Sequence, residues 1–303
     1  MPLDPLIAPL LKVVNERPRP EWTGDAAERR RQFAQRPDNP YASFAEVEPE
    51  TDIQVEGNVR IYPTPGARGA LVFFHGGGWW LGSAADSDMR CRAFAARAGV
   101  TVFSVDYRLA PEHPFPTALE DCYQALTWAV DQADRFGFDP ELVAVAGESA
   151  GGNLAAAVAL LARERGGPSL KLQLLEIPAL DLTLSSPSIE RYAKGYVLSA
   201  EDLRWCVEQY MKGHDPADPL VSPLLAEDLT GLPPAYIAVA EFDPLVDDGH
   251  RYAERLKEAG VPVTLRVFEG QVHGSQSLTA LLPAAREWRD SVVGAVREHL
   301  SPA

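Results

Sequence analysis

A serine between two glycines is the first feature of the sequence that could carry out a reaction. Ser149 lies in "AVAGESAGGNLAAA", where an apolar run ends and an alanine-rich helical pattern begins. One interpretation is a tight turn, since sharp turns use glycine and serine commonly caps a helix. The other is the G-x-S-x-G nucleophile elbow, which presents a serine hydroxyl at the edge of a parallel sheet. The pentapeptide alone leaves both open, and the second requires a base, an acid and oxyanion donors elsewhere.

A base for Ser149 should follow it in the chain, because the fold that uses this elbow orders its triad as serine, acid and histidine. Five of the six histidines precede the serine, lie in a proline-rich insertion or fall in helical patterns: His75, His113, His214, His250 and His299. His273 instead stands in "EGQVHGSQS", between the last apolar run and the last helical pattern. His273 is therefore the predicted base.

The predicted acid is Asp243, which ends the strand pattern "AYIAVAEFD" just before Pro244 begins a helix. As an alternative, Asp243 could serve only as a helix N-cap. The rival carboxylates are Asp181, Glu241, Asp247 and Asp248. The last two already belong to the helical pattern, and Glu241 lies nearer the body of the strand.

Three consecutive glycines, Gly76 to Gly78, follow another buried strand pattern in "FFHGGGWW". A flexible loop would explain them, but glycines are entropically costly and are kept where backbone N–H groups must point at a ligand. In this fold the loop before the elbow supplies oxyanion donors, in a His-Gly-Gly-Gly form. Together, the loop and the elbow favour a nucleophilic serine over a simple turn.

The elements that would position these residues follow an α/β pattern. Short apolar runs typical of buried parallel strands are "GALVFFHG", "TVFSVDY", "ELVAVAGES", "LQLLEIP", "AYIAVAEFD" and "VTLRVFEG". Alternation in "IQVEGNVRIYP" predicts an antiparallel hairpin before them. Helices are expected from about Leu6 and at about 86–98, 116–136, 151–165, 200–212, 245–259 and 278–299. This order predicts a mostly parallel central sheet with right-handed crossovers.

The alternation of strand and helix fails between "LEIP" and "AYIAVA", where more than fifty residues hold one clear helix and many prolines. We interpret residues 1–45 and 180–225 as a helical cap over the carboxyl edge of the sheet, where such folds bind ligands. Residues 46–179 and 226–303 are the predicted catalytic domain.

Composition narrows the kind of partner. The chain has 303 residues and a net charge of −15, which argues against binding to nucleic acid or to anionic membranes. It contains no run of about 18 apolar residues, so no membrane span is predicted. The N-terminus lacks a basic region and carries Asp4, unlike a signal peptide. Cys91, Cys122 and Cys206 are too few and scattered for a disulfide framework, so a cytoplasmic protein is expected.

Further motifs give the chain a family resemblance. They are "HGGGWW", "SVDYRLAPEHPFPTALED", "GESAGGNLAA", "SPLLAEDLTGLPPAYIAVAEFDPLVDDG" and "EGQVHG". From about Val47 to the C-terminus, the chain resembles the hormone-sensitive-lipase-like family of α/β-hydrolase esterases, whose motifs occur in this order. The resemblance implies an α/β-hydrolase fold with Ser149 as nucleophile, His273 as base and Asp243 as acid.

The resemblance also describes the substrate site. It implies an oxyanion hole formed by the N–H groups of Gly77, Gly78 and Ala150. The cap, which includes "AKGYVLSAEDLRW", is similar to the family's cover over the acyl and alcohol pockets. We expect Trp80, Leu198 and Trp205 to line the substrate pocket.

The sequence departs from the family pattern in three places. Glu148 stands where many members carry aspartate, and "HGSQS" lacks the aromatic of the usual His-Gly-Phe, which should open the pocket. Glu176 replaces an expected apolar or tyrosine residue, and it either pairs with an arginine or borders the pocket. The segment "YRLAPEHPFP" is interpreted as a rigid turn with an internal ion pair between Arg108 and Glu112.

These features predict a serine carboxylesterase that hydrolyses short- to medium-chain esters through an acyl-enzyme. The expected partner is a small-molecule ester, and the expected assembly is a monomer or homodimer. No cofactor or metal is predicted, because no cluster has ligand spacing. An amide or formamide hydrolase with the same triad is the alternative. A non-catalytic receptor on this fold is less favoured, because all three triad residues are retained.

Overall fold

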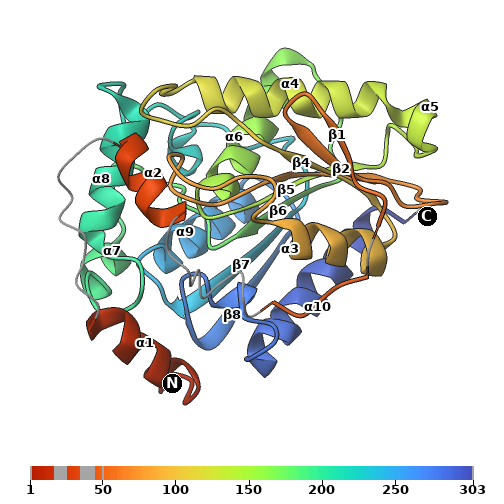
Figure 1. Cartoon of the computed structure of the whole chain (residues 1–303). Coiled ribbons are helices and arrows are strands. Elements are labelled where there is room, and N and C mark those ends of the chain that lie inside the picture. The colour runs from red at the N-terminus through yellow and green to blue at the C-terminus, as the bar shows by residue number, and fades with distance from the viewer. Residues whose placement is uncertain (1, 17–25, 35–44, 50, 302–303) are drawn as a thin grey trace.

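A single sheet of eight strands runs through the computed structural model, which describes residues 2–16, 26–34, 45–49 and 51–301 (Figure 1). The spatial order is β1-β2-β4-β3-β5-β6-β7-β8. The strands are β1 (Gln54–Glu56), β2 (Val59–Tyr62), β3 (Ala70–Phe74), β4 (Thr101–Val105), β5 (Val143–Glu148), β6 (Leu172–Glu176), β7 (Ala235–Phe242) and β8 (Val263–Val272). β2 is antiparallel to both β1 and β4, and all other neighbours are parallel. The predicted hairpin and the mostly parallel sheet are confirmed.

Helices cover both faces of the sheet. In Figure 1, α4 (Thr117–Asp131) and α6 (Ala150–Arg165) lie above it, while α3 (Asp88–Ala93) and α10 (Pro283–His299) lie below it. A π-helical turn (Phe94–Ala98) extends α3, and α9 (Val246–Glu258) packs on β7 and β8. This three-layer arrangement agrees with the α/β sheet that the alternating pattern predicted and with the α/β-hydrolase fold that the family resemblance implied.

Two predicted helices differ at their boundaries. The helix expected over 116–136 ends at Asp131 and is followed by the short α5 (Ala133–Phe136). The last helix begins at Pro283 and not at Leu278, because residues 278–282 form turns and proline favours the first helical turn.

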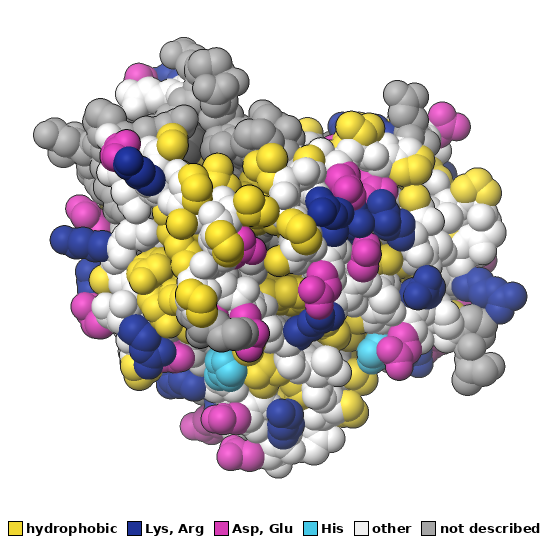
Figure 2. Space-filling view, turned by 90° about the horizontal axis from the view of Figure 1, so that it is seen from below, with side chains coloured by type: hydrophobic (Ala, Val, Ile, Leu, Met, Phe, Trp, Pro, Cys, Tyr) yellow, Lys and Arg dark blue, Asp and Glu magenta, His cyan; other side chains and the backbone are white. Residues whose placement is uncertain are grey.

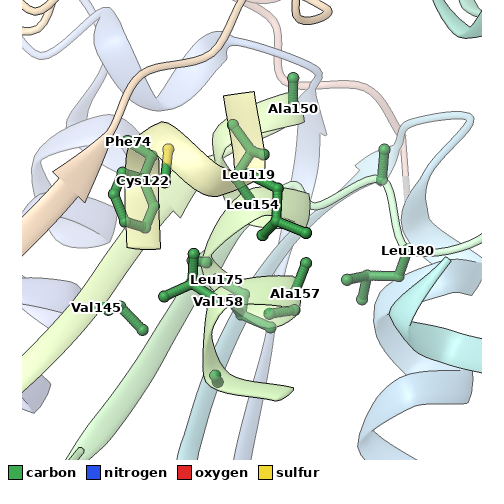
Figure 3. Packing of buried hydrophobic residues seen from close by; sticks show 14 of the residues in the cluster. Phe74, Leu119, Cys122, Val145, Ala150, Leu154, Ala157, Val158, Leu175 and Leu180 are labelled. Atoms are coloured by element: carbon green, nitrogen blue, oxygen red, sulfur yellow. The ribbon is translucent and has the colours of Figure 1, made fainter. Parts of the chain in front are cut away.

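The core beneath the elbow is built from small and branched side chains. Ala150, Leu154, Ala157 and Val158 of α6 face Val145 and Leu175 of the sheet and Leu119 of α4 (Figure 3). All these side chains are buried, and each leucine or valine contributes about 1.5–3 kcal/mol through that burial. α6 is thereby held close to the sheet at the end that carries Ser149.

Four helices lie together at the left of Figure 1: α1 (Ile7–Glu16), α2 (Ala26–Ala34), α7 (Pro187–Arg191) and α8 (Ala200–Met211). α8 starts with a capping box in which Ser199 and Asp202 satisfy each other's backbone N–H groups. Its buried stripe includes Leu203, Val207 and Tyr210. Residues 17–25 and 35–44 of the predicted cap lie outside the described residues.

α1 is the helix predicted from about Leu6. Ile7 and Leu11 are buried in a cluster with Val272 of β8. On its outer side Leu6 and Val13 are 52% and 51% exposed, and the face seen in Figure 2 carries a broad apolar area. Within the described ranges, no helix has both the length and the apolar composition needed to cross a bilayer.

The ion pair predicted between Arg108 and Glu112 is wrong. Arg108 pairs with Asp121 of α4, with a 2.7 Å contact, and the same carboxylate accepts the backbone N–H of Arg108. Glu112 pairs instead with Arg30 of α2, at 2.8 Å. Because Arg108 pairs with Asp121 on α4, Glu112 is left to pair with Arg30 on α2.

Candidate active site

Ser149 occupies a strained turn between β5 and α6, with φ 54° and ψ −116°. Its N–H donates to the main-chain oxygen of Glu176 at 2.8 Å. A Cβ atom on Gly147 would lie 2.2 Å from the oxygen of Gly151, and one on Gly151 would lie 2.0 Å from the oxygen of Phe74. The two glycines therefore allow the strand and helix to approach, and a positive φ at a non-glycine residue is typical of a functional site.

Three side chains from three strand ends form one hydrogen-bonded chain. Ser149 follows β5, Asp243 follows β7 and His273 follows β8, and these parallel strands end at the same edge of the sheet. The Nε2 atom of His273 is 3.1 Å from Ser149 Oγ, and its Nδ1 atom is 2.8 Å from Asp243 Oδ2. This arrangement places the imidazole proton on Nδ1 and leaves Nε2 to accept from the serine hydroxyl.

Asp243 is held in place on its other side. Its Oδ1 atom accepts the backbone N–H of Leu245 at 2.9 Å, and its side chain is 1% exposed. A buried carboxylate with one oxygen for the backbone and one for the imidazole orients the ring and can stabilise its charged form.

The rival carboxylates bond elsewhere. Asp181 pairs with Arg251, Glu241 accepts from the N–H of Gly270, Asp247 from that of Ser188, and Asp248 from that of Leu180. Of the rival histidines, His75 contacts the Gly76 oxygen and His299 contacts the Ala295 oxygen. The structure therefore brings together the three predicted residues and none of these alternatives.

The glycine loop turns beside the elbow. Gly77 and Gly78 have φ of 117° and 58°, and a Cβ on Gly77 would lie 2.0 Å from the oxygen of Leu81. Among the described residues, no backbone or side-chain acceptor takes the N–H of Gly77, Gly78 or Ala150. Three such donors beside a serine suit an oxyanion, because fixed dipoles stabilise developing charge without reorganisation.

His75 packs beside this loop and hydrogen-bonds to it. Its ring stacks on Tyr107 with centroids 4.2 Å apart, and its Nδ1 atom is 2.7 Å from the oxygen of Gly76. Burial lowers the pKa of His75, so the ring is neutral and donates from Nδ1. The first residue of the "HGGG" segment thus packs and orients the loop.

Glu176 pairs with an arginine, which decides between the two roles left open for it. It is fully buried and accepts from Arg90 Nε at 2.9 Å and from Trp288 Nε1 at 2.7 Å.

The other two departures from the family pattern are hydrogen-bonded to each other. Glu148 is partly buried and accepts from Gln276 Nε2 at 3.1 Å. Ser275 and Gln276 are both buried, and the expected opening of the pocket beside them stays a prediction.

The three expected pocket residues lie next to the glycine loop or near α8. The rings of Trp80 and Trp205 meet edge to face, with centroids 4.9 Å apart. Leu198 is partly buried and precedes α8. Cys206 of the same helix packs on the glycine loop, since a Cβ on Gly78 would lie 2.7 Å from its sulfur. The contact of any of these residues with substrate stays a prediction.

Sequence reasoning missed Arg30. Its guanidinium donates to the main-chain oxygens of Trp80 at 2.6 Å and Ala110 at 2.7 Å, which ties α2 to the loop after the glycines. The run "ERRRQ" has the appearance of a solvated helix face. Arg29 also turns inward, since it is 4% exposed and lies over the Trp205 ring, and no local signal separates these two arginines from the exposed Arg31.

Comparison with known proteins agrees with this geometry. A family profile of the alpha/beta hydrolase fold matches residues 71–277. The chain is 45% identical over 265 residues to the carboxylic ester hydrolase LipN of Mycobacterium tuberculosis, covering 83% of this chain and 70% of LipN. It is 40% identical over 249 residues to the ethyl acetate hydrolase of Pseudomonas putida, covering 80% and 78%. The solved hyperthermophilic esterase of Pyrobaculum calidifontis superposes with a TM-score of 0.92 at 38% identity, covering 98% and 99%.

The fold and the Ser149–His273–Asp243 arrangement define an α/β-hydrolase with the geometry of a serine hydrolase. With these matches, the chain belongs to the hormone-sensitive-lipase-like family of α/β-hydrolase carboxylesterases.

Proposed function

We propose that this protein is a serine carboxylesterase in which Ser149 is the nucleophile, His273 the base and Asp243 the acid. The observation that carries the proposal is the continuous hydrogen-bonded chain from Asp243 to Ser149 at a strained elbow. The names of related proteins, which include a carboxylic ester hydrolase and an ethyl acetate hydrolase, support the same reaction class.

The proposed reaction follows from the atoms in place. Ser149 Oγ attacks the ester carbonyl as His273 Nε2 takes its proton, and Asp243 stabilises the resulting imidazolium. The tetrahedral oxyanion accepts hydrogen bonds from the N–H groups of Gly77, Gly78 and Ala150. His273 then protonates the departing alcohol, and a water molecule activated by the same imidazole cleaves the acyl-enzyme.

We infer a preference for short- to medium-chain esters. In this proposal the rings of Trp80 and Trp205, which meet edge to face, limit the length of the acyl chain. The proposed division into a cap (1–45 and 180–225) and a catalytic domain (46–179 and 226–303) assigns Leu198 and Trp205 to the cap. In this proposal the cap residues determine which substrate is preferred, and the residues at the carboxyl edge of the sheet carry out the reaction.

We also propose a cytoplasmic location and a monomer or homodimer in solution. Cys91, Cys122 and Cys206 are buried free thiols, which suits a reducing compartment. Light scattering on the purified protein measures the assembly.

A substrate panel tests the proposed function. p-Nitrophenyl esters from acetate to palmitate, with matched anilides, are assayed with wild type and Ser149→Ala. The proposal predicts the highest kcat/KM on short or medium esters and no turnover by Ser149→Ala. Faster cleavage of anilides would favour an amide hydrolase, and turnover of neither class would refute the proposal.

A further inference from the structure

The turn that follows His273 is fixed mainly by bonds within itself. Gly274 has φ 84°, and residues Ser275–Ser277 form a single 3-10 turn. Two backbone hydrogen bonds lie within the turn. The N–H of Ser277 donates to the oxygen of Gly274 at 3.3 Å, and the N–H of Leu278 donates to the oxygen of Ser275 at 3.0 Å. These hydrogen bonds shape the turn but do not connect it to the β5–α6 segment that carries Ser149.

Gln276 makes that connection. It is 2% exposed, and its Nε2 donates to Glu148 Oε2 at 3.1 Å. Within the described residues, this is the one side-chain hydrogen bond from the 274–278 turn to the β5–α6 segment. Gln276 Oε1 accepts no bond there, so the donor role fixes the orientation of the amide. A flipped amide would set its oxygen against the carboxylate.

Glu148 is well placed to receive this bond, because it is the residue immediately before Ser149. A Cβ atom on Gly76 would lie 3.2 Å from Glu148 Cγ, so the Glu148 side chain lies against the start of the oxyanion loop. Burial lowers the pKa of Arg90, but the Glu176 and Glu148 carboxylates together raise it above its usual value. Glu148 is thus a carboxylate near the elbow, the oxyanion loop and a buried guanidinium.

We propose that Gln276 is a positioning residue, which clamps the turn after His273 onto Glu148 and thereby keeps His273 Nε2 within reach of Ser149. The inference rests on the proposed function. The side-chain hydrogen bond of Gln276 goes to Glu148 and not to Ser149 or His273. It acts through distance, because a shift of about 1 Å in a reacting group can cost on the order of 100-fold in rate.

An exchange of donor and acceptor tests the clamp. Gln276→Glu keeps the side-chain shape but brings two carboxyl groups together. We expect kcat at pH 8 to fall at least tenfold, about 1.4 kcal/mol, with KM within twofold of wild type. Glu148→Gln retains an acceptor oxygen and should lose about threefold or less. The double variant Gln276→Glu/Glu148→Gln restores the bond in the opposite direction and should return kcat to within threefold of wild type.

Two controls separate positioning from folding. Gln124→Glu adds the same charge at an exposed position of α4 and should retain wild-type kcat. Gln276→Met removes the donor without adding a charge and reports on the clamp even where Gln276→Glu does not fold. For every variant, the urea midpoint is measured beside kcat, because a purely structural role would lower the midpoint and leave kcat unchanged.

Unchanged kcat in Gln276→Glu or Gln276→Met would overturn the proposal, and so would a double variant no faster than Gln276→Glu. These outcomes differ from a failure of the proposed function. That failure would appear as a wild type without esterase activity, or as a Ser149→Ala variant that keeps it.

Discussion

The buried ion pair behind the elbow gives the strongest prediction about stability. Arg90 and Glu176 are 10% and 0% exposed, and the guanidinium supplies two of the donors to the carboxylate. Arg90→Met removes the positive charge but keeps most of the volume. Because the unpaired carboxylate stays buried, we expect the free energy of unfolding to fall by about 3–5 kcal/mol at pH 8.

The sign of the pH dependence follows from burial. Burial raises the pKa of Glu176, and the charge of Arg90 opposes this effect. Without Arg90 the pKa rises further above its unfolded value of about 4.3. Because the pKa of Glu176 is higher in the folded than in the unfolded protein, the protonated carboxyl favours folding. Its full contribution to the free energy of unfolding is present below the unfolded pKa and is lost as pH rises through the folded pKa. The penalty of Arg90→Met should therefore shrink steadily from pH 8 to pH 5.

Urea unfolding followed by circular dichroism at pH 5, 6.5 and 8 measures this penalty. Arg204→Met is the matched control, because Arg204 pairs with Glu190 where the two side chains are 57% and 75% exposed. Such a surface pair contributes about 0–1 kcal/mol. Arg90→Met/Glu176→Met should recover only part of the loss. Apolar replacement of a buried pair is often neutral, but Trp288 Nε1 then lacks its acceptor, which costs about 1–3 kcal/mol. A penalty below about 1 kcal/mol at pH 8, or one independent of pH, would refute the reasoning.

Three further predictions concern activity. Gly77→Ala should lower kcat on the order of 100- to 1000-fold, because its Cβ would lie 2.0 Å from the Leu81 oxygen. Gly57→Ala is the control: Gly57 also has a positive φ but has open space around it, so the variant should lose stability and keep its kcat. Leu198→Ala and Trp205→Ala should each shift the preferred acyl length by about 1–3 kcal/mol in discrimination, and an unchanged chain-length profile in both folded variants would show that neither lines the pocket. EDTA should leave kcat/KM unchanged, because the proposed reaction uses no metal, and a loss that zinc restores would contradict the mechanism.

The meeting of Ser149, Asp243 and His273 could be predicted because each follows a buried strand pattern. Parallel strands bring their carboxyl ends to one edge, and the order of serine, acid and histidine known for this fold selected among the candidate residues. Gly147 and Gly151 were informative for a different reason: only a residue without a side chain permits the close backbone contacts at the elbow.

The contacts of long polar side chains could not be predicted in this way. Arg30 reaches Glu112 across 82 positions, and Gln276 reaches Glu148 across 128. Nothing in the local sequence sets such distances, because they depend on how whole elements pack. The wrong pairing of Arg108 with Glu112 has the same origin: nearness in sequence was a poor guide to the nearest carboxylate.

Covalent capture of the nucleophile tests the central claim most directly. The protein is treated with a fluorophosphonate, digested, and the modified peptide is identified by mass spectrometry, with residual esterase activity measured in parallel. We predict one adduct per chain, on Ser149, with activity lost in proportion to labelling and no labelling of Ser149→Ala. An adduct on another residue that accounts for the lost activity, or full activity in a protein labelled at Ser149, would contradict the account.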